Sequence, residues 1–247
     1  MKIRLDELLV NRGLAVSRSA AQRMVMEGKV RVKDHPDPKS GNKYADDIEV
    51  ELIAESRFVS RGGEKLEGAF KAFNLDVTGL KCLDVGASTG GFTDCLLQHG
   101  AAHVIALDVG IDQFHPRLRE DPRVTVIEKF NARNLKAADL PYTPEFAVCD
   151  VSFISLRLIL PPMAAVLATG SGIVTLIKPQ FEAGRGQVGK GGVVRDEAVR
   201  LEVVATIKTF GESIGLVWNG VAESPITGPK GNIEYTAYWS NRSVTDG

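Results

Sequence analysis

The sequence lacks long hydrophobic segments and paired cysteines. Its 247 residues contain no run of about 18 apolar residues, so no membrane-spanning helix is expected. Residues 1–7 are rich in charge and lack the apolar core of a signal peptide. Cys82, Cys95 and Cys149 form no C-x-x-C pair, which favours buried thiols in a reducing compartment over disulfides or zinc ligands. These absences predict a cytoplasmic protein without a metal or a stable membrane association.

Charge is balanced overall but unevenly placed. The formal net charge is −1, yet residues 1–33 hold eight Lys or Arg against three acids, and the remainder holds 22 basic and 28 acidic residues. A basic segment attached to an acidic body suggests that the segment contacts a polyanion such as nucleic acid. The alternative is a solvated helix face that happens to be basic.

The most informative segment is L-D-V-G-A-S-T-G-G-F at residues 83–92. An apolar strand ends at an acid, a glycine loop follows, and an amphipathic helix comes next, which is the first βα turn of a doubly wound sheet. The glycine spacing differs from the G-x-G-x-x-G of dinucleotide folds. Asp84 can accept hydrogen bonds from a positively charged ligand, such as the amino-acid end of S-adenosylmethionine. A glycine turn without a ligand is the alternative.

Seven apolar segments alternate with helical segments. This pattern predicts an α/β fold with a doubly wound, mostly parallel, seven-stranded Rossmann-like sheet. The strands are expected at residues 82–85, 104–107, 124–128, 146–150, 172–179, 217–223 and 233–239, with helices at residues 65–73, 92–99 and 196–215.

Polar residues follow several of these strands, where ligands bind in such sheets. Asp108 lies 22 positions after Gly86, the separation expected of a carboxylate that binds the ribose of an adenosine. Asn131 follows the third strand and is expected near the adenine. The predicted adenosylmethionine site comprises Asp84, Gly86, Ala87, Ser88, Thr89, Gly90, Gly91, Phe92, Asp108 and Asn131.

The first 53 residues predict a separate small α+β domain. Helices are expected at residues 4–12 and 18–27, followed by short strands near residues 29–33 and 48–53. Residues 54–64 are expected to form a linker with Gly62 and Gly63 as its hinge-like point, before a domain over residues 65–247.

The pattern R-L-D-x-L-L, followed by S-R-x-x-A and V-x-V, resembles the S4-like (αL) RNA-binding module. Many such modules have an Asn-Gly turn after the V-x-V strand, whereas this sequence has K-D-H-P at residues 33–36. The resemblance implies contacts with RNA phosphates, the usual source of RNA affinity. The candidates for these contacts are Arg4, Arg18, Lys29, Arg31 and Arg61.

Nearly the whole chain resembles the TlyA family. The resemblance rests on the S4-like pattern, S-R-G-G-x-K-L (60–66), the glycine loop, C-D-V-S-F-I-S-L (149–156), I-K-P-Q-F-E (177–182) and G-N-I-E-Y (231–235). Members are described as haemolysins and as methyltransferases that modify the 2′-oxygen of cytidine in ribosomal RNA. The resemblance implies an FtsJ/RrmJ-type catalytic domain, adenosylmethionine as cofactor, and ribosomal RNA or ribosomal subunits as partners.

The FtsJ type also implies a Lys-Asp-Lys-Glu catalytic tetrad. Its members here are Lys65, Asp150, Lys178 and Glu234, with Lys178 as the expected central residue. A free lysine has a pKa of about 10.4 and must lose affinity for its proton to act as a base near pH 7. The sequence leaves open whether Lys178 removes the hydroxyl proton or orients the hydroxyl. A membrane-active haemolysin and a non-catalytic RNA-binding scaffold are alternative functions.

Overall fold

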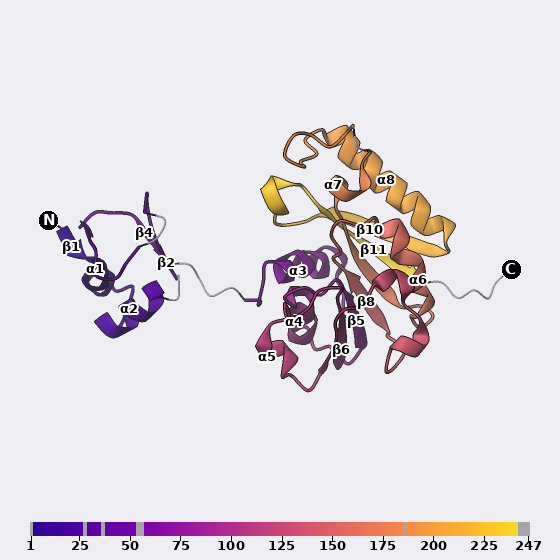
Figure 1. The fold of residues 1–247 in the computed structure, drawn as a ribbon, viewed down its shortest axis with the longest axis horizontal. Helices are drawn as coiled ribbons and strands as arrows, with labels where there is room; N and C mark the ends of the chain where they lie inside the picture. The colour runs from indigo at the N-terminus through magenta and orange to yellow at the C-terminus, as the bar shows by residue number, and fades with distance from the viewer. Residues whose placement is uncertain (1, 27–28, 36–37, 53–56, 185, 242–247) are drawn as a thin grey trace. The chain divides into compact units, whose positions relative to one another are not determined.

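The computed structural model contains two compact units, residues 1–57 and residues 58–247 (Figure 1). It describes residues 2–26, 29–35, 38–52, 57–184 and 186–241. The predicted domain limits stay a prediction.

The N-terminal unit is a small α+β structure with its own core. Two antiparallel strand pairs, β1 with β3 and β2 with β4, accompany two helices. The buried face of α1 contributes Leu5, Leu8 and Leu9, which pack with Ala21 and Val25 of α2. The elements are β1 (Lys2–Arg4), α1 (Leu5–Asn11), α2 (Arg18–Met26), β2 (Val30–Val32), β3 (Lys43–Ala45) and β4 (Val50–Leu52).

The second unit is built on the seven-stranded sheet that the sequence predicts. The strand order is β10-β11-β9-β8-β5-β6-β7, in which the last five strands are parallel and β11 is antiparallel to both neighbours. The α/β fold class is therefore confirmed. The strands are β5 (Lys81–Val85), β6 (His103–Leu107), β7 (Val124–Ile127), β8 (Phe146–Cys149), β9 (Gly172–Ile177), β10 (Leu216–Glu223) and β11 (Tyr235–Asn241).

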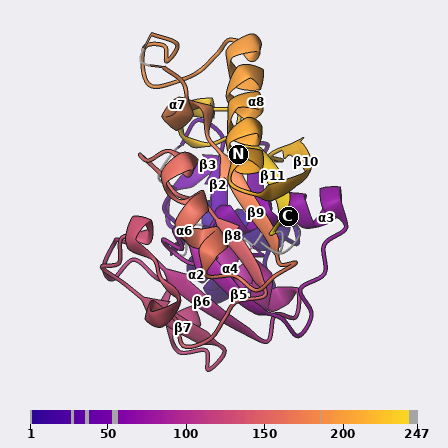
Figure 2. The same ribbon diagram turned by 90° about the vertical axis from the view of Figure 1, so that its right-hand side faces the viewer.

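Helices cover both faces of this sheet, as Figures 1 and 2 show. One hydrophobic cluster packs beneath α3, α4 and α5, and another beneath α6 and α8. Both faces of the parallel strands are thus buried, which explains their continuous apolar sequences. The helices are α3 (Gly62–Phe73), α4 (Gly91–Gln98), α5 (Pro116–Arg119), α6 (Leu160–Ala165), α7 (Pro179–Glu182) and α8 (Glu197–Ser213).

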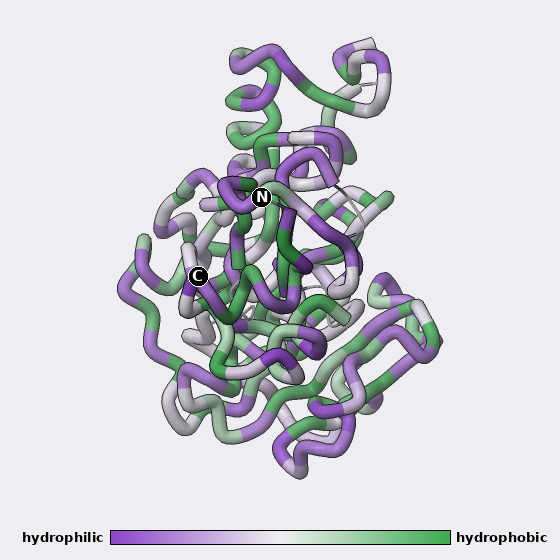
Figure 3. Tube along the Cα trace, turned by 90° about the vertical axis from the view of Figure 1, so that its left-hand side faces the viewer, coloured by the Kyte–Doolittle hydropathy of each residue, from purple (hydrophilic) through white to green (hydrophobic). Residues whose placement is uncertain are grey.

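The long helix α8 follows directly from its sequence pattern. Asp196 caps its start, because the carboxylate accepts a hydrogen bond from the backbone N–H of Ala198 at 2.9 Å. Val203, Val204 and Ile207 face the core, and the turns of this helix alternate between apolar and polar colours in Figure 3. One apolar stripe therefore attaches α8 to the sheet.

The first turn of α3 differs from the prediction. The helix begins at Gly62, three residues before the predicted start, and Gly63 is buried. A Cβ atom at Gly63 would overlap the ring of Phe58, and one at Gly91 would lie 2.8 Å from the backbone nitrogen of Gly63. These glycines permit close packing of α3 on α4 instead of forming an open hinge. Residues 54–56 of the predicted linker lie outside the described residues.

Cys82, Cys95 and Cys149 are all buried, and none of the three is in a disulfide. Burial raises the pKa of both Cys82 and Cys149 to about 12. Among the described residues, no helix combines the length and hydrophobicity needed to cross a membrane.

Candidate active site

The glycine loop after β5 forms the centre of the candidate site. Gly86 and Gly90 have φ angles of +83° and +93°, which side-chain-bearing residues rarely adopt. A Cβ atom at Gly86 would also lie 2.8 Å from the carbonyl oxygen of Asp150. Glycine thus allows the loop to lie directly against the end of β8, where Asp150 is located.

Lys178 and Asp150 form an ion pair beside this loop. Each residue directly follows a strand, β9 or β8, and these strands are parallel neighbours. The Lys178 Nζ lies 2.5 Å from Asp150 Oδ1 and donates a hydrogen bond of 2.9 Å to Ser152 Oγ. The lysine is only 7% exposed, and the ion pair and the hydrogen bond together hold its ammonium group at the edge of the sheet.

Lys65 and Glu234 form a second, more deeply buried pair. Lys65 in the first turn of α3 donates to Glu234 Oε2 at 2.6 Å, and Gln180 Nε2 donates to Oε1 at 2.8 Å. Glu234 is completely buried. Gly228 leaves room for this carboxylate, because a Cβ atom there would overlap Glu234 Oε1. The structure therefore brings the four predicted tetrad residues together as two ion pairs.

A cavity of about 390 Å³ opens above these pairs. Lys65, Asp150 and Lys178 line it, whereas Glu234 does not. The cavity is therefore bordered by both lysines and by one of the two acidic residues of the tetrad. The other lining residues are Ser60, Arg61, Gly62, Gly86, Ala87, Ser88, Thr89, Gly91, Phe92, Ser152, Thr227, Gly228 and Pro229.

A second cavity, of about 520 Å³, adjoins the first. The two share Gly86, Ser88, Asp150 and Ser152 as lining residues. Its wall includes the predicted Asp108 and Asn131, together with apolar side chains such as Phe130.

Asp108 is held by the backbone around it. Its Oδ2 accepts from the N–H of Ser88 at 2.8 Å, and its Oδ1 accepts from the N–H of Gly110 at 2.6 Å. Each carboxylate oxygen has a further lone pair, so the fixed group can accept two hydroxyl protons from a ligand.

Asp84 lies beneath the loop rather than on the wall of either cavity. It is fully buried, and its Oδ2 accepts from the hydroxyl of Thr93 at 2.7 Å. Burial raises the pKa of Asp84 to about 7. Its Oδ1 has no hydrogen-bond partner among the described residues. A buried oxygen of this kind favours a cationic or proton-donating group nearby.

Phe153 stands out beside the Lys178–Asp150 pair. Its side chain is 91% exposed and its φ angle is +63°, a strained conformation for a bulky residue. It lines the second cavity, and its ring centre lies 5.0 Å from that of Phe181. Glu182 fixes the following turn by accepting from Ser155 Oγ at 2.6 Å and Leu156 N at 2.7 Å.

The predicted RNA-binding residues fall into two groups. Arg4, Arg18, Lys29 and Arg31 belong to the N-terminal unit, where Arg31 pairs with Glu51 at 3.1 Å. Arg61 belongs to the second unit and lines the first cavity, where it donates to the carbonyl of Thr227 at 2.9 Å.

Sequence reasoning did not single out Ser152, Phe153 or Gln180. Ser152 and Phe153 lie within the C-D-V-S-F segment, and Gln180 lies within I-K-P-Q-F-E. All three residues are therefore part of motifs that carry the family resemblance. Their roles emerge only from the distances to Lys178, Phe181 and Glu234.

The sheet and its two cavities define the class of adenosylmethionine-dependent methyltransferases. The FtsJ-like methyltransferase family matches residues 58–240, and the S4 domain matches residues 3–32. A solved structure from Listeria monocytogenes, provisionally called an S-adenosylmethionine-dependent methyltransferase, shares the fold. Its TM-score is 0.56 at 16% identity, over 74% of this chain and 100% of that one.

Closer relatives identify the family. The 16S/23S rRNA (cytidine-2′-O)-methyltransferase TlyA of Mycobacterium tuberculosis is 45% identical over 95% of this chain and 88% of its own. A solved structure from Streptococcus thermophilus, provisionally called a hemolysin, has a TM-score of 0.77 and 44% identity, covering 98% of this chain and 89% of that chain. The chain belongs to the TlyA family.

Proposed function

We propose that this protein transfers the methyl group of S-adenosylmethionine to the 2′-hydroxyl of a cytidine in ribosomal RNA. The observation that carries the proposal is the Lys178–Asp150 pair, placed where two adjoining cavities share a wall. One cavity has the features of a nucleoside site, and the other is bordered by both lysines of the tetrad. The cytidine and the ribosomal RNA come from the named activity of the Mycobacterium relative.

The residues of the second cavity fit the cofactor. Asp108 would accept the ribose hydroxyls, Asn131 would contact the adenine edge, and Phe130 supplies apolar surface. The predicted contact between Asp84 and the positive amino-acid end of the cofactor gains no support from the cavities, because Asp84 is fully buried and lines neither of them. When bound, the cofactor would supply a methyl group that its sulfonium has already activated.

Lys178 would act on the acceptor hydroxyl. Ser152 accepts one of the three N–H donors of its ammonium group and Asp150 lies beside it as the ion-pair partner, so a further donor is available for the 2′-oxygen. A lysine in this position can take the hydroxyl proton or hold the oxygen in line for attack. The Lys65–Glu234 pair places a second ammonium on the same cavity and fixes its position from below.

Phe153 would contact the nucleobase of the target. An exposed aromatic ring beside a ribose-modifying site can stack on an unpaired base, and each such contact contributes about 1–3 kcal/mol. The strained backbone of Phe153 supports a functional role for its exposed position. Because the proposed substrate is ribosomal RNA, the reaction would take place in the cytoplasm.

Replacing Asp108 tests the cofactor site. Asp108→Ala should weaken adenosylmethionine binding by about 1–3 kcal/mol, because the ribose hydroxyls and two backbone N–H groups lose their acceptor. Isothermal titration calorimetry measures the affinity. Asp112→Asn, at an exposed neighbouring position whose positive φ angle asparagine tolerates, is the control for a nearby change of charge and should bind normally. Equal affinities for both variants would contradict the assignment.

Replacing Phe153 tests the base contact. Phe153→Ala should raise the KM for RNA or lower kcat/KM by about tenfold or more, while Phe153→Tyr should retain most activity because it keeps the ring. Adenosylmethionine affinity is measured on the same variants, because Phe153 lines the cavity assigned to the cofactor, and a loss confined to that affinity would place the ring on the cofactor instead of the base. If the alanine variant equals the wild type in steady-state kinetics, Phe153 does not contact the base.

The proposed function as a whole is tested by mapping modified nucleotides. Purified protein, tritiated adenosylmethionine and unmodified 16S and 23S ribosomal RNA or subunits should give 2′-O-methylcytidine. Mapping both RNAs with and without the protein identifies the position. If no methyl group is transferred to 16S RNA, to 23S RNA or to the subunits, the proposal is overturned.

A further inference from the structure

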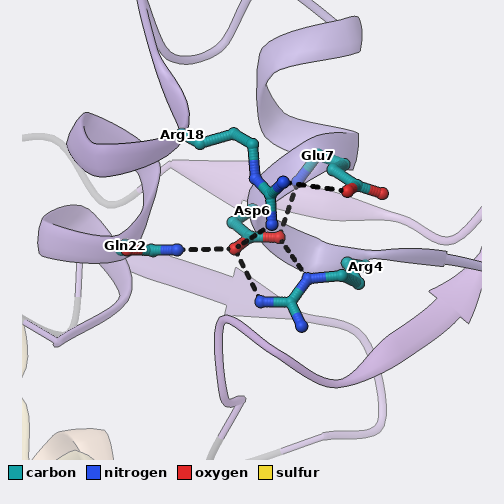
Figure 4. A network of polar contacts seen from close by, with 5 residues as sticks. All are labelled: Arg4, Asp6, Glu7, Arg18 and Gln22. Carbon is teal, nitrogen blue, oxygen red and sulfur yellow. Dashed lines mark hydrogen bonds and ion pairs between the residues drawn. The ribbon is translucent and has the colours of Figure 1, made fainter.

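A buried acid lies beneath two arginines in the N-terminal unit. Asp6 in α1 is 0% exposed, although charged side chains are rarely buried so completely without partners. Arg4 donates to both of its carboxylate oxygens, Nε to Oδ1 at 3.0 Å and Nη2 to Oδ2 at 2.9 Å. Figure 4 shows that Arg18 and Gln22, from α2, approach the same carboxylate.

The two guanidinium groups share one oxygen of Asp6. Arg18 Nη2 lies 3.4 Å from Oδ2, the oxygen that also accepts from Arg4 Nη2 and, at 2.8 Å, from Gln22 Nε2. The pKa of Asp6 is lowered, above all by its hydrogen bond with Arg4, so the carboxylate is ionised at neutral pH. Asp6 therefore fixes two arginines side by side across the junction of α1 and α2.

Both arginines still present donors to solvent. The side chains of Arg4 and Arg18 are 36% and 52% exposed. Each guanidinium has five N–H donors, and Asp6 engages two from Arg4 and one from Arg18. Gly41 lies against the Arg4 guanidinium, since a Cβ atom there would be 3.5 Å from its terminal nitrogens.

Glu7, the next residue of α1, has a different relation to the arginines. Its side chain is 41% exposed and makes one ion pair, from Oε1 to Arg18 Nη1 at 3.3 Å. A phosphate that binds Arg18 would occupy the place of this carboxylate. Asp6 therefore supports the arginines from inside, whereas Glu7 competes from outside.

We propose that Asp6 is the positioning residue that preorganises Arg4 and Arg18 for the RNA phosphate contacts expected of them, and that Glu7 competes with the phosphate for Arg18. The inference deepens the proposed RNA methylation and rests on it for the identity of the polyanion. Fixing the two long side chains before binding removes an entropic cost that free arginines incur on contact with RNA. The bidentate geometry of guanidinium groups suits phosphate oxygens.

Asp6→Asn and Glu7→Gln make a matched test, because each removes one negative charge from neighbouring positions of α1. If the acids act only through charge, both variants should bind RNA more tightly. If Asp6 preorganises the arginines, the two variants should change RNA affinity in opposite directions. Asp6→Asn should bind about tenfold more weakly, and Glu7→Gln about two- to fivefold more tightly.

The measurement is the affinity of the full chain for 16S and 23S ribosomal RNA over a range of salt concentrations. Loss of one phosphate contact in Asp6→Asn should also reduce the slope of log affinity against log salt by about 0.7–0.9. Tighter binding by Asp6→Asn, or equal effects of the two variants, would overturn the inference. The affinity for adenosylmethionine should be unchanged in both Asp6→Asn and Glu7→Gln.

A further variant covers the risk that Asp6→Asn unfolds α1, which hydrogen exchange of residues 5–11 would reveal. Arg18→Lys keeps the charge at a side chain that is half exposed, but it lacks the fork that reaches both Asp6 and a phosphate. It should bind several-fold more weakly, and wild-type affinity would overturn the inference. If wild-type protein binds RNA with these variant effects but transfers no methyl group, the proposed function fails and the phosphate site stands.

Discussion

Replacing Lys178 with alanine is expected to lower the single-turnover methylation rate by at least about 100-fold, the low end for a lost general base. The ammonium group is held by Asp150 and Ser152 at the wall of the first cavity, where the target hydroxyl would bind. Affinities for RNA and adenosylmethionine should remain within a few-fold of wild type, because the interaction is needed mainly in the transition state. Rapid-quench measurements with saturating RNA give the rate directly.

Lys178→Arg separates the two roles of the lysine. Arginine retains the positive charge but cannot accept a proton at neutral pH. Substantial activity in this variant would exclude the base role and leave orientation of the hydroxyl as the function. Ser152→Ala should lower the rate less, because it removes the hydrogen-bond acceptor of Lys178 but leaves the ion pair with Asp150. A wild-type rate for Lys178→Ala would contradict the proposed mechanism.

Removing Lys65 alone should destabilise the second unit by about 3–5 kcal/mol, because the fully buried Glu234 would lose its charged partner. The double variant Lys65→Met with Glu234→Gln should recover most of this stability, since it leaves no buried unpaired charge. The double variant should nevertheless remain inactive, because the second ammonium would be missing from the cavity.

Both tryptophans of the chain, Trp218 and Trp239, lie in the second unit, so their fluorescence reports its unfolding in urea. Single-turnover methylation measured on the same samples separates stability from catalysis. A double variant as unstable as Lys65→Met alone would show that the unpaired charge of Glu234 is not the cause of the loss. An active double variant would show that catalysis does not need the second ammonium.

The sheet could be predicted well because its signals are local. Continuous apolar segments and the acid or base at the end of each parallel strand marked β5, β6, β8 and β9 within a few residues. The strand pair β1 and β3 was not predicted, because each strand has three residues and no extended alternation. The start of α3 was missed because Gly62 and Gly63 resemble a flexible segment when their packing against Phe58 is unknown.

The site could be predicted only in part, because several of its contacts join residues that lie far apart in the sequence. The family resemblance supplied Lys65, Asp150, Lys178 and Glu234, which the fold brings together. Partners such as Gln180 depend on a contact between side chains 54 positions apart, and no local pattern encodes that contact. The sequence also gave no sign that Asp84 lies below the loop, since burial depends on Thr93 and the helix above it.

The wall shared by the two cavities has a consequence for inhibition. Gly86, Ser88, Asp150 and Ser152 border both spaces, so a molecule bound in one has an end close to a molecule bound in the other. A single compound that joins an adenosine to the 2′-oxygen of a cytidine through a short tether would occupy both at once. Its second half would then bind at a high effective concentration, which can increase affinity by about 10²–10⁴ over either half alone.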